Sequence, residues 1–219
     1  MKNFLVIFLI FKGLKLDKTL KIHIDFIYIK EWCMKTKEFF ELGYDKQVSE
    51  NYNEAIEYYD KVLELDCNFE RAYVQRAHCK YQLEQYESAI EDFKTALELN
   101  PNDSLTYLNL AYICFNLKNN DDLVYVNKAV ELDSNLPEAH FLKGQIFLNL
   151  NENSNAVVEF SKAIELNPTW SAFYLSRANA YERLNEFKKA LEDYMKIKQI
   201  EPDFSDIDSY IENCQKEIV

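Results

Sequence analysis

The sequence predicts an all-α fold made of about five tandem helix pairs followed by one final helix. A pattern of small and large apolar residues returns about every 34 residues along most of the chain. Only 3 glycines and 4 prolines occur among the 219 residues, too few for the tight turns of an all-β domain. All 4 prolines lie where one proposed repeat gives way to the next. A fixed period of this length is the sequence signature of a stacked repeat protein.

The second helix of each repeat is visible as an amphipathic pattern. In residues 86–100, Ala89, Ile90, Phe93 and Leu97 recur at the spacing of one helix face. The same pattern occupies residues 52–66, 153–167 and 187–201. The prolines that follow these segments are Pro101, Pro168 and Pro202. Because proline disfavours helical backbone in the residue before it, each of them is expected to end a second helix.

The first helix of each repeat carries a small residue at a fixed place. These residues are Gly43, Ala77, Ala111, Gly144 and Ala178, spaced by 34, 34, 33 and 34 residues. Helix axes that pack about 8–10 Å apart need small side chains where the backbones approach most closely. We therefore divide the chain into repeats at residues 36–69, 70–103, 104–136, 137–170 and 171–204. The third repeat is one residue short, and Asp122 stands where the other repeats have alanine.

Residues 205–219 are expected to form a helix that caps the last repeat. Ile207, Tyr210, Ile211, Cys214 and Ile218 make one apolar stripe at helical spacing. Because a helix pair cannot bury its apolar face alone, the exposed end of a repeat array needs such a cover.

Residues 1–35 differ from the rest of the chain. They carry seven lysines against three acids, a charge of +4, whereas the whole chain carries −12. Phe4–Phe11 is an unbroken apolar run, but it is much shorter than the ~20 residues of a membrane span. Farther along, Ile22, Ile24, Phe26 and Tyr28 alternate as in a strand.

Three interpretations of this leader remain open. It could be a targeting or anchoring element, with membrane contact through residues 1–12 only. It could be an ordered extension that packs on the repeats or lies in their groove. Alternatively, translation could begin at Met34, just before the first repeat.

Composition argues against nucleic-acid binding and against catalysis. A net charge of −12 repels phosphate backbones. The five cysteines contain no CxxC pair, and the three histidines lack metal-ligand spacing, so we predict neither a metal nor a cofactor. No GxSxG motif and no glycine-rich phosphate loop occurs. Acidic pairs such as Glu91-Asp92 and Glu192-Asp193 fall on the polar side of second helices and are expected to be solvated.

The repeat resembles the tetratricopeptide repeat family over residues 36–204. The resemblance rests on the 34-residue period, the small residues in both helices and the Leu-Asn-Pro endings of repeats two and four. Lys46 and Lys80 depart from the aromatic residue that the family prefers, and Cys67 and Ser134 depart from its proline. The resemblance implies a right-handed α-α superhelical solenoid with a concave groove lined by the first helices, in which members hold a peptide or helix of another protein.

The groove-facing places of the family can be carried over when each repeat is counted from Thr36, Glu70, Ser104, Pro137 or Ser171. The fifth place reads Phe40, Val74, Leu108, Phe141 and Leu175. The ninth place reads Tyr44, His78, Tyr112, Gln145 and Asn179, and the sixth contributes Gln75 and Asn109. Apolar anchors beside hydrogen-bonding side chains suit a peptide with apolar side chains and an unpaired backbone. Alternatively, part of the fifth-place stripe packs between neighbouring first helices.

The carboxylate clamp of the family's chaperone-binding members is not expected here. Those members use lysine, arginine and asparagine at set places in three successive repeats. In repeats one to three the matching residues are Phe40, Tyr44, Gln75, Leu105 and Asn109. The frames that begin at repeats two and three fail in the same way.

We therefore expect a non-catalytic interaction scaffold or adaptor that binds a partner protein in its groove. It is expected to be cytoplasmic, and a monomer or weakly self-associating. Alternatives are a self-associating structural solenoid and a membrane-tethered assembly factor.

Overall fold

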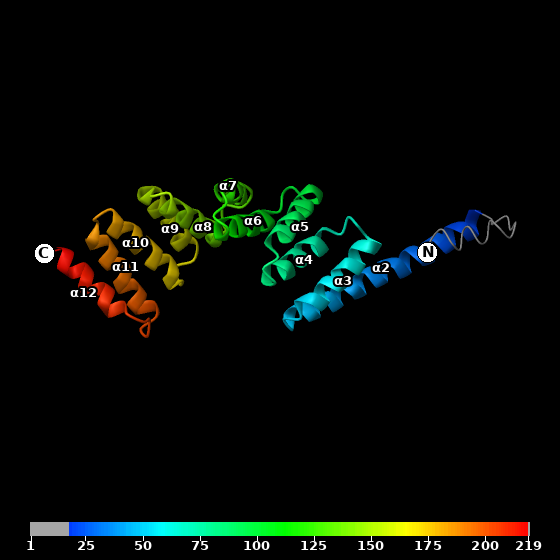
Figure 1. The fold of residues 1–219 in the computed structure, drawn as a ribbon, viewed down its shortest axis with the longest axis horizontal. Helices are drawn as coiled ribbons and strands as arrows, with labels where there is room; N and C mark the ends of the chain where they lie inside the picture. Colours follow the sequence, from blue (N-terminus) through cyan, green and yellow to red (C-terminus); the bar gives the residue numbers. More distant parts are fainter. Residues whose placement is uncertain (1–17, 219) are drawn as a thin grey trace. The chain divides into compact units, whose positions relative to one another are not determined.

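The computed structural model describes the backbone of residues 18–218 and the side chains of residues 32–218. All regular elements in this range are helices, arranged as successive antiparallel pairs (Figure 1). In order they are α2 (Lys18–Val48), α3 (Tyr52–Leu65), α4 (Glu70–Gln82), α5 (Tyr86–Leu99), α6 (Ser104–Asn116), α7 (Asp122–Leu132), α8 (Pro137–Asn149), α9 (Asn153–Leu166), α10 (Ser171–Arg183), α11 (Phe187–Ile200) and α12 (Ile207–Ile218). The predicted all-α solenoid of helix pairs is confirmed.

The helices divide into two compact units, with α2–α5 in the first and α6–α12 in the second. Four first helices begin at Glu70, Ser104, Pro137 and Ser171, the residues at which the sequence was divided. The division of the chain into an N-terminal leader, five repeats and a cap as separate domains stays a prediction.

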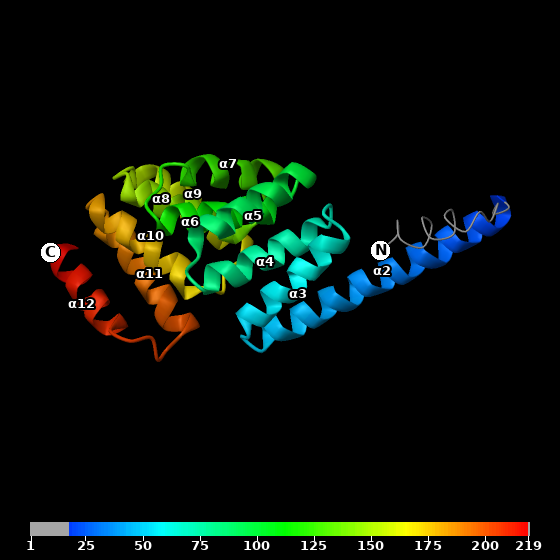
Figure 2. The same cartoon turned by 45° about the vertical axis from the view of Figure 1, so that its right-hand side comes forward.

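Helix α2 corrects one sequence interpretation. The alternating segment from Ile22 to Tyr28 is helical and is not a strand, and the expected boundary at residue 36 falls inside α2. Two views show α3 beside the C-terminal part of α2, while the N-terminal part of α2 extends past it (Figures 1 and 2). A helix pairs the backbone N–H and C=O groups of this segment with one another and needs no partner strand. The run Phe4–Phe11 and the possible membrane contact through residues 1–12 lie outside the described residues.

No helix in the described part of the chain combines the length and the apolar character that crossing a bilayer requires.

The small residues of the first helices do the steric work that their spacing predicts. A Cβ atom built on Gly43 would lie 2.8 Å from Cε1 of Tyr59, and one on Gly144 only 2.5 Å from Cε1 of Phe160. Both rings are fully buried. A glycine in the first helix therefore lets the facing aromatic ring of the second helix fill the space between the two axes.

Each helix pair is joined by the same turn, although no glycine is present in it. One residue in each turn has a left-handed backbone, and the five are Glu50, Glu84, Lys118, Asn151 and Asn185, with φ between 54° and 60°. The next N–H donates to a carbonyl five residues earlier, as from Gln85 to Lys80 at 2.9 Å. This is the Schellman ending of a helix, in which glycine usually holds the left-handed position.

The third repeat has a shortened second helix. Helix α7 has 11 residues, whereas α3, α5, α9 and α11 have 14 each. It begins at Asp122, and Val126 occupies the place of the rings of Phe93 and Phe160. The loss of a large ring and of part of a turn agrees with the eroded pattern seen in the sequence.

Buried ion pairs join the first and second helices in three of the five repeats. Arg76 contacts Asp92 at 2.6 Å, Arg177 contacts Asp193 at 2.6 Å, and Lys143 contacts Glu159 at 2.7 Å. The equivalent positions in repeats one and three hold Leu42 with Tyr58 and Leu110 with Tyr125. A cation therefore faces an acid, and an apolar residue faces a tyrosine, at the same point of the helix pair.

Helix α12 closes the second unit. Ile207 and Cys214 are buried against α11, and the Cys214 thiol donates to the carbonyl of Phe187 at 2.9 Å. The Tyr210 ring stacks on Tyr194 with 5.3 Å between centroids and 15° between planes. The residues that face the last helix pair are those of the apolar stripe predicted for a cap.

Candidate partner-binding face

The first helices of neighbouring repeats lie side by side within each unit. Helix α2 contacts α4 in the first unit, and α8 contacts both α6 and α10 in the second. No comparable contact joins α7 to α9 or α9 to α11 in the described second unit. The first helices are therefore the inner side of this unit, and side chains that they project away from the second helices form its candidate partner-binding face.

The fifth-place residues of each unit are largely used in packing. Phe40 and Leu108 are buried, at 9% and 6% exposure. Phe141 is half-buried, with its ring 4.9 Å from that of Phe173 on the next repeat. Val74 and Leu175 are also half-buried. The alternative interpretation of the stripe, packing between neighbouring repeats, therefore describes Phe40 and Leu108.

In the first unit, two predicted polar residues have different surroundings. Gln75 accepts a hydrogen bond from Gln47 at 3.1 Å, and Gln47 in turn accepts one from the buried Tyr59 hydroxyl at 2.7 Å. This chain ties α2, α3 and α4 together, so Gln75 is engaged within the protein. Tyr44, in contrast, is 51% exposed and can reach a partner.

The histidine predicted in the face lies against an aromatic ring. His78 meets Phe93 edge to face, with 5.2 Å between ring centroids. Burial lowers the pKa of His78, so its ring is neutral at pH 7. It therefore adds no charge to this part of the first unit.

In the second unit, the predicted polar residues all keep part of their surface in solvent. Asn179 is exposed, and Asn109, Tyr112 and Gln145 are half-buried. Burial raises the pKa of Tyr112, and the nearby carboxylate of Glu138 raises it further, which keeps the phenol protonated. Gln145 and Asn179 have no hydrogen-bond partner among the described residues.

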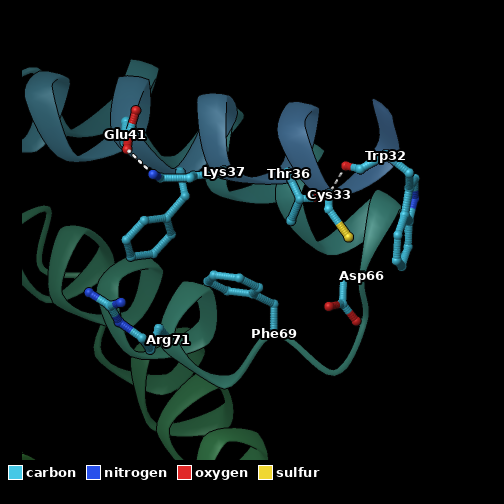
Figure 3. A pocket seen from close by; sticks show the side chains of 9 residues that line it. Trp32, Cys33, Thr36, Lys37, Glu41, Asp66, Phe69 and Arg71 are labelled. Carbon is cyan, nitrogen blue, oxygen red and sulfur yellow. Dashed lines mark hydrogen bonds and ion pairs between the residues drawn. The ribbon is translucent and has the colours of Figure 1, made fainter. Parts of the chain in front are cut away.

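A pocket in the first unit includes residues that the sequence pattern does not predict. It has a volume of about 490 Å³ and lies between the start of α4 and the part of α2 around Thr36 (Figure 3). We call it the Trp32 pocket. Its aromatic wall comes from Trp32, Phe40 and Phe69, and its charged rim comes from Lys37, Glu41, Asp66 and Arg71. Trp32 precedes the repeat pattern, and only the extension of α2 brings it to the pocket, so the 34-residue period carried no signal for it.

The described residues contain no group of three or more His, Cys, Asp or Glu side chains placed to hold a metal ion. The chemistry that this face offers is packing and hydrogen bonding.

Family models for the tetratricopeptide repeat match most of the repeated region. They cover residues 70–103, residues 93–123, and the three segments 49–68, 137–169 and 171–204. Comparison with curated proteins gives no match.

Several solved structures share the fold. MamA from Desulfovibrio magneticus RS-1 superposes with a TM-score of 0.72 at 18% identity, over 78% of this chain and 97% of that one. A repeat protein from Cytophaga hutchinsonii gives 0.72 at 21% identity, over 82% and 71%. YrrB, described as having an unusual peptide-binding site, gives 0.66 at 24% identity, over 81% and 90%. At these identities the likeness concerns the fold.

Proposed function

Because the chain belongs to the tetratricopeptide repeat family, we propose that it is a non-catalytic adaptor that binds a segment of a partner protein along its first helices. The family is in general made of interaction modules, which supports a protein or peptide as the partner. The proposal assigns no reaction to the chain.

The observation that carries the proposal is the pair of amides on the inner side of the second unit. Gln145 on α8 and Asn179 on α10 occupy the same place of successive repeats and lack hydrogen-bond partners among the described residues. An amide offers both a donor and an acceptor, as does each peptide unit of an extended segment. Two such side chains on adjacent helices can therefore hold the backbone of a segment that crosses them.

Apolar side chains on the first helices of the second unit supply the second part of a binding surface. Leu105 on α6 is 55% exposed, and Leu175 on α10 is half-buried next to Asn179. Burial of apolar area gives affinity at about 25 cal/mol per Å², while backbone hydrogen bonds set the register of the bound segment. The combination favours a segment with apolar side chains over a highly charged one.

YrrB, which is described as having an unusual peptide-binding site, shares this fold and so supports the same kind of role.

Selection of peptides from a display library against the full-length chain tests the proposal. Selected peptides should bind Gln145→Ala and Asn179→Ala variants several-fold more weakly, because each variant removes one or two hydrogen bonds. Asn127→Ala provides the matched control, since Asn127 is an exposed amide on the second helix α7. A library that yields no binder, or binders that lose affinity only with Asn127→Ala, would contradict the proposal.

A further inference from the structure

The Trp32 pocket has a guanidinium at its rim, that of Arg71, which pairs with no oxygen among the described residues. We propose that this pocket binds a partner side chain that is apolar or aromatic and stands next to a carboxylate, and that Arg71 receives this carboxylate. The inference rests on the peptide-binding function proposed above and specifies the chemistry of a peptide that the first unit binds.

The size and the wall of the pocket suit an apolar group. A volume of about 490 Å³ lies within the range of about 300–1,000 Å³ typical of ligand pockets. The Phe40 and Phe69 rings lie 5.2 Å apart between centroids and form a tilted pair. Trp32 and Phe69 both keep part of their surface exposed, so an entering apolar side chain would cover aromatic surface that is now in water.

The charge of Arg71 points to an anion. Its guanidinium carbon lies 4.9 Å from the centroid of the Phe40 ring, and the side chain is exposed. Among the described residues Arg71 makes no ion pair, whereas Arg76 and Arg177 each pair with buried aspartates. Stacking on the ring keeps the planar fork of donors oriented, which is the geometry that takes a carboxylate with two parallel hydrogen bonds.

Asp66 and Lys37 at the rim each have a contact within the protein, and that of Lys37 is weak. The Asp66 carboxylate accepts from the backbone N–H of Asn68 at 3.1 Å, and the equivalent loops repeat this bond at Asp133 and Asn167. Lys37 contacts Glu41 at 3.6 Å, with both side chains largely in solvent. A pair this exposed adds little and leaves the lysine available.

The two cations share one end of the pocket. Figure 3 shows Arg71 and the Lys37–Glu41 ion pair at one end, Asp66 and Trp32 at the other, and the Phe69 ring between them. An acidic residue that follows an apolar residue along a peptide can therefore reach Arg71 while the apolar side chain covers Phe69. An inorganic anion would meet Arg71 but would leave the aromatic wall in water.

Trp32 itself reports on occupancy. The chain has 2 tryptophans, so a full-length Trp170→Phe variant leaves Trp32 as the single emitter. Phenylalanine keeps the ring contact that Trp170 makes with Phe173 at 5.1 Å. The probe is the peptide acetyl-Gly-Phe-Leu-Glu-Gly-amide, and its partner peptide carries Gln in place of Glu.

We expect the Glu peptide to shift the Trp32 emission with a Kd below about 1 mM and the Gln peptide to bind roughly tenfold more weakly, as for loss of a charge-assisted hydrogen-bond pair. Arg71→Gln should abolish the difference between the peptides. Arg183→Gln, at an exposed arginine of the second unit, should preserve it.

Three results would overturn the inference. The first is unchanged Trp32 emission with up to about 1 mM Glu peptide, and the second is equal binding of the Glu and Gln peptides. The third is an emission shift produced by inorganic phosphate as readily as by the Glu peptide. If these results appear while library peptides still depend on Gln145 and Asn179, the pocket assignment fails and the adaptor function stands. If no library peptide binds, the adaptor function itself fails.

Discussion

The buried ion pair of the fifth repeat allows a sharp test of what holds the helix pairs together. The Arg177 Nε and Nη2 atoms donate to the two carboxylate oxygens of Asp193 at 2.9 and 2.6 Å, and Nη1 donates to Ser161 at 3.0 Å. The two side chains are 19% and 6% exposed. Arg177→Leu would leave the Asp193 carboxylate buried without its partner.

The size of the effect follows from that burial. Removing one partner of a buried pair costs about 3–5 kcal/mol, because the remaining charge is desolvated and unpaired. Asp193→Asn should cost less, about 1–2 kcal/mol, because Arg177 keeps Ser161 and is nearer to solvent. The double variant Arg177→Leu with Asp193→Tyr copies the residues found at the equivalent positions, Leu110 and Tyr125. Replacing a whole buried pair by apolar groups is often neutral, so this variant should lie within about 1 kcal/mol of the wild type.

Urea denaturation followed by circular dichroism at the helix band measures these differences as free energies of unfolding. The single variants Arg177→Leu and Asp193→Tyr, together with the variant that combines them, make a thermodynamic cycle in which the expected coupling is at least about 2 kcal/mol. The reasoning is wrong if Arg177→Leu lowers the free energy of unfolding by less than about 1 kcal/mol. It is also wrong if the double variant loses as much stability as the two single variants together, because the cation–acid and leucine–tyrosine pairs would then not be equivalent.

Three further predictions concern other parts of the helix pairs. Gly144→Ala should destabilise the fold by about 1–3 kcal/mol, because the new methyl group would meet Phe160 at 2.5 Å. Phe160→Val should relieve this loss in a double variant. A Gly144→Ala protein that melts at a higher temperature than the wild type would contradict the prediction. Glu84→Gly should raise the free energy of unfolding by about 1 kcal/mol, because Glu84 has φ 60°, a left-handed backbone that glycine adopts without strain. Asn185→Gly should raise it less, because asparagine tolerates this backbone better than glutamate does. Equal gains for the two variants in urea denaturation would argue against backbone strain. Burial acts to raise the pKa of Glu159, but hydrogen bonds from His140 and Lys143 outweigh it and hold that pKa below its ordinary value. The carboxylate therefore stabilises the fold above its unfolded pKa, and this contribution is lost as the pH falls through the folded pKa. From about pH 5 to about pH 3, the Glu159→Gln variant should lose stability less steeply than the wild type, and parallel curves would refute this.

The fold was largely predictable from the sequence because the same pattern of small and large apolar residues recurs along five repeats. Small residues such as Gly144 and large ones such as Phe160 recur at fixed places, and each occurrence supports the others. The ion pairs could have been found in the same way. An acidic residue stands at the matching place of the second helix wherever the first helix carries Arg76, Lys143 or Arg177. Where the first helix carries Leu42 or Leu110 instead, the matching place holds tyrosine. The alternation at Ile22–Tyr28 misled, because a segment outside the repeat has no second copy to correct its interpretation.

The candidate face was predictable only in part. Counting along the repeat selects side chains by their angle around a helix, and Tyr44, Gln145 and Asn179 do reach solvent. The same count selected Phe40 and Leu108, which neighbouring helices bury, and Gln75, which the chain from Tyr59 engages. Their role in partner binding stays a prediction, and the experiments above decide it.

The sequence by itself determined the helix pairs, their order, the close contact of small and aromatic residues, and the cap at the C-terminal end. These properties depend on spacing within one repeat, and spacing is what a period records. Only the tertiary structure decided which side chains of the inner face remain free, and that Trp32, Phe69 and Arg71 surround one pocket. The physical reason is that the burial of a side chain depends on how one repeat packs on the next, and here also on the extension of α2 beyond the repeated region. The position of a residue within one repeat gives only its angle around its own helix, and that angle predicts neither of these.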